Sequence, residues 1–259
     1  VTYSGMLQLS EVLGDKKYAD YVYDRLNVIG KAYPHVKKYC DETGYSMRLT
    51  PLNTPKWLDD CGAMTAAMIK ATLADPARSK EFRALLDNWF VFTMYEEYRM
   101  SDGILARHRP VTNSVWLDDM FMGIPAIAWY GKLTGDKKYY DEAIRQIMLF
   151  KEKMWVPEKK LFRHGWIESM TEHPSFHWGR ANGWAILTLC EVLDALPENY
   201  PGRQDLLELL REHASGLLAL QSGEGFWHQL LDRNDSYLES SATAIYAYCF
   251  AHGINEGWL

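Results

Sequence analysis

Two pairs of acidic residues carry the side chains best suited to acid–base chemistry. Residues 57–60 and 116–119 both read Trp-Leu-Asp-Asp, and each pair stands where an apolar run begins. Capping residues followed by apolar periodicity are typical of the start of a buried helix. Successive helical residues point about 100° apart, so only one acid of each pair can face a central site. The other acid can cap or charge the helix end, and capping alone is the alternative role for both pairs.

The repetition of this string at equivalent points of the chain favours a catalytic role. Two carboxylates on neighbouring helices could face each other across one site. Such pairs suit glycoside chemistry, because mutual repulsion and burial keep one carboxyl protonated near neutral pH. We therefore predict that Asp118 is a catalytic acid/base at the mouth of a helical barrel.

A second motif, Trp-Gly-Arg-Ala-Asn-Gly-Trp at residues 178–184, could bind a charged sugar. Arg180 offers a planar fork for a carboxylate, and Trp178 and Trp184 could flank a sugar ring. His164 lies on the loop before this motif, within Phe-Arg-His-Gly-Trp. The alternative is an ordinary helix start with packed tryptophans, a structural arginine and a hydrogen-bonding histidine.

Metal, phosphate and nucleophile motifs are not found in the sequence. His173 and His177 have a ligand-like spacing, but Pro174 prevents a regular helix there, so we expect no metal. Four cysteines are widely spaced without a Cys-x-x-Cys pair, and three of them read as small buried hydrophobic residues. Neither a glycine-rich phosphate loop nor a serine nucleophile elbow is present.

An internal repeat of about 60 residues organises the chain, enough for two helices and their loops. Helices rich in Ala, Gly and Met alternate with amphipathic ones, which indicates inner and outer helices of an all-α, α/α toroid. The predicted inner helices are 3–13, 58–73, 116–133, 184–196 and 242–250. The predicted outer helices are 17–31, 79–98, 137–154 and 203–220.

About nine helices are fewer than the twelve or so of a ring of six helix pairs. We therefore expect residues 1–259 to form a single barrel domain that lacks its C-terminal helices and a short N-terminal segment; the alternative is an open ring. The long segments before the inner helices are expected on one rim, where function concentrates. These segments are 40–57, 99–115, 155–178 and 221–239.

Composition excludes several classes of partner. The chain has 28 basic and 34 acidic residues and no basic face, so nucleic acid is not an expected partner. The longest nearly apolar run, 121–130, is too short to span a bilayer, so no membrane is expected either. Aromatic residues make up 14% of the chain, an excess that suits stacking on sugar rings or simple core packing.

Four strings in the order WLDDCGAM, RHRPVTNSVWLDDMFM, FRHGW and FHWGRANGW resemble glycoside hydrolase family 105. This family contains the unsaturated rhamnogalacturonyl hydrolases and is close to the family 88 unsaturated glucuronyl hydrolases. The resemblance implies an (α/α)6 barrel. It also implies that Asp118 is the general acid/base and that Asp59 is the second aspartate of the site.

The resemblance further implies a set of substrate-binding residues and no cofactor. The residues that match positions lining the family's sugar subsite are His108, Trp116, His164, Trp178, Arg180 and Trp184. One departure is Ile167, where the family often has an aspartate.

The implied activity removes a 4,5-unsaturated uronic acid from the non-reducing end of oligosaccharides that polysaccharide lyases produce, as in pectin and rhamnogalacturonan breakdown. Acid-catalysed hydration of the ring's vinyl ether would drive it, in bacterial periplasm or cytoplasm. The oligomeric state and the preferred aglycone sugar are open. The alternatives are an inverting glycosidase, a sugar epimerase, or a non-catalytic carbohydrate-binding helical-repeat module.

Overall fold

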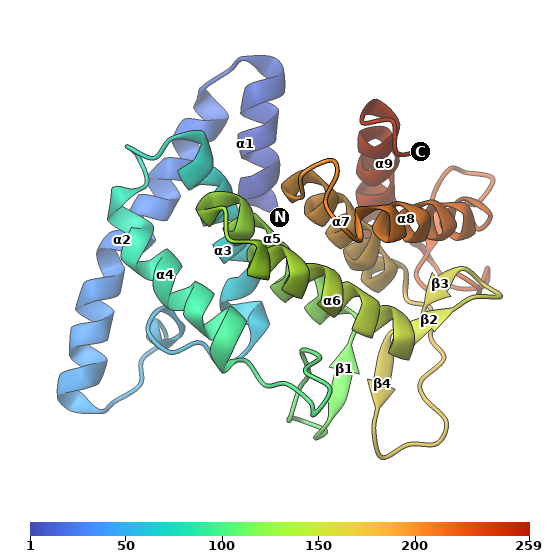
Figure 1. Cartoon of the computed structure of the whole chain (residues 1–259), viewed down its shortest axis with the longest axis horizontal. Helices are drawn as coiled ribbons and strands as arrows, with labels where there is room; N and C mark the ends of the chain where they lie inside the picture. Colours follow the sequence, from blue (N-terminus) through green and yellow to red (C-terminus); the bar gives the residue numbers. More distant parts are fainter. The chain divides into compact units, whose positions relative to one another are not determined.

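The computed structural model describes residues 1–259, and helices dominate it (Figure 1). They are α1 (Thr2–Leu13), α2 (Lys17–Thr43), α3 (Leu58–Ala74), α4 (Arg83–Val91), α5 (Asp118–Thr134), α6 (Lys137–Met154), α7 (Gly179–Ala195), α8 (Arg203–Leu218) and α9 (Ser240–Asn255). None of these helices combines the length and apolar character needed to cross a bilayer.

The predicted helices are confirmed in number and order, and several differ in extent: α7 begins at Gly179 rather than 184, and α9 continues to Asn255 rather than 250. Helix α6 has the predicted bounds, but α2 continues to Thr43 instead of ending near residue 31. Pro34 lies inside α2, and the helix continues because Tyr33 and Val36 beyond its first half are still buried in the core. It ends at Gly44, whose φ of 68° is the left-handed conformation that glycine adopts without strain.

The outer helix predicted over 79–98 is divided into three segments of different helix type, namely 3₁₀, α and π. A 3₁₀ turn at Lys80–Phe82 precedes α4, and a π turn at Phe92–Glu96 follows it. The wider π turn allows Phe92 and Thr93 to be buried together with Phe90. The sequence shows a continuous apolar pattern here and does not reveal where the hydrogen-bond spacing changes.

Three short antiparallel strand pairs occur in the long segments between helices. They are β1 (Ser114–Trp116) with β4 (Gly165–Ile167), β2 (Trp155–Val156) with β3 (Leu161–Phe162), and β5 (Trp227–His228) with β6 (Leu238–Glu239). Strands of two or three residues are too short to show an alternating pattern, so the sequence did not predict them.

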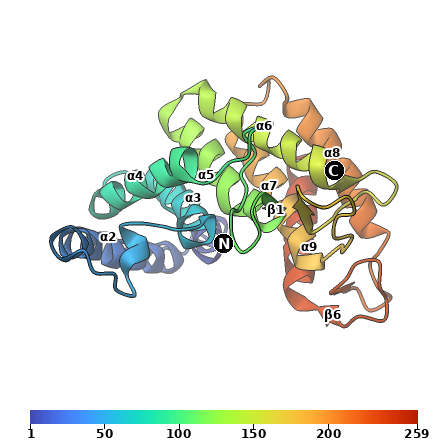
Figure 2. The ribbon, with the colours of Figure 1, turned by 90° about the horizontal axis from the view of Figure 1, so that it is seen from below.

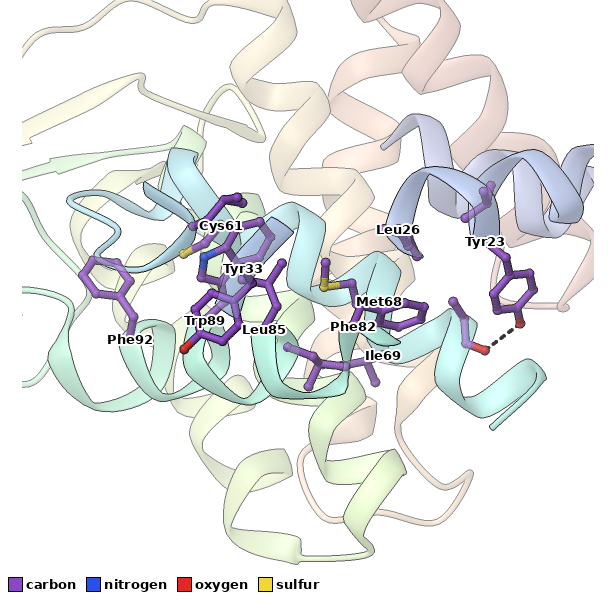
Figure 3. Packing of buried hydrophobic residues seen from close by; sticks show 14 of the residues in the cluster. Tyr23, Leu26, Tyr33, Cys61, Met68, Ile69, Phe82, Leu85, Trp89 and Phe92 are labelled. Atoms are coloured by element: carbon purple, nitrogen blue, oxygen red, sulfur yellow. Dashed lines mark hydrogen bonds between the residues drawn. The ribbon is translucent and has the colours of Figure 1, made fainter. Parts of the chain in front are cut away.

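The chain divides into two compact units, and every helix except α5 lies within one of them; α5 has residues in both. The first unit comprises Val1–Glu97 and Pro125–Asp136. Its core gathers Leu26 of α2, Met68 of α3, Leu85 and Trp89 of α4, and Phe82 of the 3₁₀ turn before α4 (Figure 3). Helix α1 differs from the prediction of an inner helix buried all round, since it has no buried residue and packs on this core through one side only.

The second unit comprises Tyr98–Ile124 and Lys137–Leu259, and α7 forms its centre between α8 and α9 (Figure 2). Helix α7 is buried on nearly all sides, as predicted for an inner helix. Its glycines permit this packing, because a Cβ on Gly183 would lie 3.1 Å from the Ile245 side chain of α9. Cys190 and Cys249 are buried here and Cys61 in the first unit, as predicted, and all four cysteines are free.

Candidate active site

The acid Asp118 begins α5 in the second unit, directly after strand β1. Strand β1 pairs with β4, which sets Trp116 opposite Gly165. The pairing continues past the strands, since the Leu117 N–H donates to the His164 carbonyl at 3.0 Å. Backbone hydrogen bonds therefore hold the start of α5 next to the loop that carries His164.

The side chains of Asp118 and His164 meet at this point. Oδ2 of Asp118 lies 3.4 Å from Nδ1 of His164, and the two side chains are 16% and 28% exposed. Burial lowers the pKa of the His164 imidazole, Asp118 opposes this shift, and the positive charge of Arg107 adds to it. The imidazole beside Asp118 is consequently neutral at physiological pH.

Two tryptophans enclose His164. The ring of Trp116 meets the imidazole edge-on at a centroid distance of 5.8 Å, and Trp178 does so at 5.0 Å. Nε1 of Trp178 is buried and makes no hydrogen bond within the protein. An unpaired buried donor is costly, so an oxygen of a bound ligand would relieve that cost.

Arg180 extends the cluster from the first turn of α7. Its guanidinium carbon lies 4.3 Å from the centre of the Trp178 ring, and its Nη1 is 3.6 Å from Oε1 of Glu239. Glu239 precedes α9, and its Oε2 accepts the Ala242 N–H. Burial alone raises the pKa of the Glu239 carboxyl, but hydrogen bonds from Ser241 and Ala242 and the charge of Arg180 outweigh this and lower it.

The second acid of the pair, Asp119, is buried against Arg107. Nε of Arg107 donates to Oδ2 of Asp119 at 2.8 Å, and Nη2 donates to Oδ1 at 2.6 Å. The same guanidinium lies over the Trp116 ring at 4.5 Å. Sequence reasoning placed Arg107, Asp119 and Glu239 at helix starts or in loops without giving them partners, because each pairing depends on how the loops fold.

The remaining sequence-predicted site residues lie against other partners. Trp184 stacks on Phe121 of α5, with ring centroids 5.1 Å apart. His108 is exposed and lies 5.3 Å from the ring of Tyr98. The structure thus brings five of the predicted residues into one chain of contacts, and these are Trp116, Asp118, His164, Trp178 and Arg180.

Asp59 lies in the first unit, in the first turn of α3, where it is exposed. Its neighbour Asp60 accepts the Lys56 N–H at 2.8 Å. In both Trp-Leu-Asp-Asp strings the second acid therefore has a structural partner and the first acid is the more exposed. That the first acid of each string faces a catalytic site remains a prediction.

The histidines with ligand-like spacing both bond to backbone atoms. Nδ1 of His177 lies 3.1 Å from the Phe162 carbonyl, and Nδ1 of His173 accepts the Ile167 N–H at 3.4 Å. Ile167, where the family often has an acid, lies in β4 opposite Ser114. No group of three or more His, Cys, Asp or Glu side chains is arranged to hold a metal ion.

Comparison with solved structures shows the fold. A family 105 glycoside hydrolase of C. acetobutylicum superposes with a TM-score of 0.79 at 24% identity, covering 100% of this chain and 71% of that chain. The unsaturated glucuronyl hydrolase of Bacillus sp. GL1 gives 0.68 at 19% identity, covering 96% and 65%. The fold is therefore the α/α-barrel fold of these hydrolases, as predicted.

Comparison of sequences shows the family. The sequence model of Glycosyl Hydrolase Family 88 matches residues 1–259. The chain belongs to this family, which confirms the predicted relationship.

Named relatives share part of the chain. The unsaturated rhamnogalacturonyl hydrolase YesR of Bacillus subtilis is 31% identical over 159 residues, which are 59% of this chain and 46% of that protein. An unsaturated 3S-rhamnoglycuronyl hydrolase of Alteromonas sp. is 33% identical over 150 residues, covering 56% and 36%. The chain spans less than half the length of these relatives.

Proposed function

We propose that the protein is a glycoside hydrolase that removes a 4,5-unsaturated uronic acid from the non-reducing end of lyase-generated oligosaccharides, of the pectin and rhamnogalacturonan type. The observation that carries this proposal is the half-buried Asp118 carboxyl beside a neutral imidazole and between two tryptophans. Such a setting suits a carboxyl that must hold a proton and release it to a sugar. Family membership and the names of the relatives agree with this chemistry.

The reaction needs a proton donor, a proton acceptor and water. Asp118 donates its proton to C4 of the unsaturated ring, so a C4–H bond forms and the C4=C5 double bond is lost. Positive charge is then shared by C5 and the ring oxygen. Water adds its oxygen to C5 and returns a proton to the Asp118 carboxylate. The C5 hemiketal opens by cleavage of its bond to the ring oxygen, and the resulting hemiacetal at C1 releases the aglycone.

His164 and the aromatic side chains prepare Asp118 for this step. A neutral imidazole offers no positive charge to the carboxyl, which suits a group that must carry a proton before it reacts. Trp116 and Trp178 exclude water from one side of the pair.

Arg180 supplies the positive charge for the uronate carboxylate. Its planar guanidinium suits bidentate carboxylate binding, and its stacking on Trp178 fixes its orientation. Its side chain is 38% exposed, so donors remain accessible to a ligand. On the family resemblance, His108 and Trp184 also line the sugar subsite, and Asp59 acts as the second acid.

The ultraviolet absorbance of the conjugated double bond in an unsaturated disaccharide tests the proposal. Asp118→Asn removes the proton donor, so we expect turnover to fall about 10²–10⁴-fold. Asp205→Asn is the matched control, because Asp205 is also an aspartate in the first turn of a helix, the exposed start of α8. Equal turnover by Asp118→Asn and the wild type would overturn the assignment of Asp118.

The same assay separates the rival functions. An inverting glycosidase would cleave saturated glycosides and leave the absorbance of the unsaturated substrate unchanged. An epimerase would isomerise a free sugar, and a carbohydrate-binding module would show calorimetric affinity without turnover. The proposed reaction uses only proton transfer and water, so bacterial periplasm and cytoplasm both suit it.

A further inference from the structure

Arg107 occupies a point where three parts of the second unit meet. Its backbone pairs with Ser114 in both directions, through Arg107 N–H to the Ser114 carbonyl at 2.7 Å and the reverse bond at 3.1 Å. Its guanidinium forms two hydrogen bonds with Asp119 on α5 and lies over the Trp116 ring of β1. The side chain is only 14% exposed.

The ion pair between Arg107 and Asp119 is buried, so it stabilises the protein only if the two groups are well aligned. The Asp119 side chain is 3% exposed, and a buried carboxylate without a paired cation is strongly destabilised. A bidentate arginine satisfies both oxygens of that carboxylate in one plane, which a lysine cannot do. The carboxylate next to Asp118 in the sequence is thereby held away from it and electrically compensated.

We propose that Arg107 is a positioning residue for the reaction, acting through Asp119 and Trp116 on the orientation of Asp118. The planar guanidinium of Arg107 holds the first turn of α5 through Asp119, and it holds the ring of Trp116, which packs against His164. Asp118 lies between Trp116 and Asp119 in the chain, so the contacts of these two residues with Arg107 together set the orientation of its carboxyl group. This inference rests on the proposed function, in which Asp118 is the proton donor.

Four variants test the inference with the unsaturated disaccharide: Arg107→Lys, Arg107→Met, Asp119→Asn and the double variant Arg107→Met/Asp119→Asn. Arg99→Lys is the matched control, since Arg99 is a half-buried arginine of the same unit paired with Glu142. The measurements are kcat, KM and the pH profile of kcat/KM, with Tm as a check on folding.

We expect Arg107→Lys to fold and to lose at least ~10-fold in kcat with KM changed less than ~3-fold, because a misplaced acid slows the chemical step more than binding. Arg99→Lys keeps the wild-type kcat. The pH profile of kcat/KM is a second test, because the pKa of Asp118 depends on nearby charges. The groups that supply these charges are Arg107, Asp119 on α5 and His164 beside β4. Arg107→Met leaves the negative charge of Asp119 uncompensated, which raises the pKa of Asp118 and moves the alkaline limb of the profile to higher pH.

Asp119→Asn leaves the positive charge of Arg107 uncompensated, which lowers the pKa of Asp118 and moves the alkaline limb to lower pH. The double variant removes both charges and returns the limb toward the wild-type position, even if Arg107→Met alone is too unstable to measure. Wild-type kcat in both Arg107→Lys and Asp119→Asn would overturn the inference, as would limbs that do not move. A wild-type protein that leaves the double bond intact would instead refute the proposed function itself.

Discussion

At the scale of single residues, Glu239 controls how much of the Arg180 charge a substrate meets under the proposed function, in which Arg180 binds the uronate carboxylate. Its carboxylate lies 3.6 Å from the guanidinium while also accepting the Ala242 N–H at the start of α9. A substrate carboxylate must therefore share Arg180 with an anion that belongs to the protein. In the proposed function, this arrangement limits the affinity for an anionic sugar and links substrate binding to the N-terminal end of α9.

Glu239→Gln should lower KM for the unsaturated uronate about 2–5-fold at low ionic strength, because the amide still accepts the Ala242 N–H but no longer carries a charge. The effect should fade as salt is added. Glu212→Gln, on the exposed surface of α8, changes the net charge equally and is the control. A higher KM in Glu239→Gln would show that Glu239 mainly orients Arg180.

Residue types and spacing were sufficient to predict the centre of the candidate site. The repeated Trp-Leu-Asp-Asp string pointed to Asp118, and the motifs around His164 and Trp178 pointed to its neighbours. The pairings of Arg107 with Asp119 and of Arg180 with Glu239 could not be predicted. Each joins residues whose approach depends on loop conformation, for which sequence spacing carries no signal.

At the scale of elements, Asn182 joins α7 to its surroundings. It is fully buried, and its Oδ1 accepts the Phe162 N–H of β3 at 2.9 Å and lies 3.0 Å from Nε2 of His213 on α8. Its Nδ2 donates to the Phe162 carbonyl at 3.0 Å. Asn182 in the 178–184 motif thus serves the packing of α7, while Trp178 and Arg180 belong to the candidate site.

Asn182→Ala should lower the free energy of unfolding by about 2–4 kcal/mol, because it leaves the Phe162 N–H and Nε2 of His213 without their buried partners. Urea denaturation at neutral pH measures this loss. Asn199→Ala, at an exposed position before α8, should change stability by less than about 0.5 kcal/mol. Similar losses in the two variants would contradict the role of Asn182.

Element order was predictable where apolar periodicity is long, as in α6, whose bounds agree with the prediction. It was not predictable for β1 and β4, although these strands position Trp116 and His164. Three residues are too few to display alternation, and the pairing joins segments far apart in the chain. The elements closest to the candidate chemistry were therefore the least visible in the sequence.

At the scale of the whole molecule, His213 makes stability depend on pH. Its ring is fully buried between Trp155 and Phe162, and burial lowers its pKa to about 3. Oδ1 of Asn182 can only accept, so Nε2 of His213 carries the proton, and Nδ1 has no partner within the protein. A second proton would have to reside on that buried, unpaired nitrogen.

The direction of this pH dependence follows from the pKa values of His213 in the folded and unfolded protein. The unfolded chain binds a proton near pH 6.5 and the folded protein does not, so stability is present above that value and is lost as pH falls toward about 3. This group alone should remove about 2 kcal/mol between pH 7 and pH 5. His252 acts oppositely, because its hydrogen bond with Asp194 raises its pKa and its contribution is lost as pH rises.

His213→Gln should reduce the loss of stability between pH 7 and pH 5, since glutamine can donate to Asn182 but does not titrate. Urea denaturation at pH 7, 6 and 5 measures the slope. His35→Gln, an exposed position on α2, should leave the slope as in the wild type. An unchanged slope in His213→Gln would show that the ring is charged in the folded protein.

The repeat of helix pairs predicted the α/α fold class, because its period recurs whatever the loops contain. The exposure of α1 could not be predicted in the same way. Its sequence is as apolar as that of a buried helix, and burial depends on which neighbours surround it rather than on its own composition.

The main chain that holds His164 has a consequence for changing this protein. The His164 N–H donates to the Phe176 carbonyl at 2.8 Å, and its carbonyl accepts the Leu117 N–H. Such bonds are indifferent to the side chains around them, and residues 169–175 between the two anchors are mostly exposed. Under the proposed function, the exposed residues 169–172 and 175 can be varied to seek new sugar preferences, while His173, which accepts the Ile167 N–H of β4, is kept so that the geometry of Asp118 and His164 is preserved.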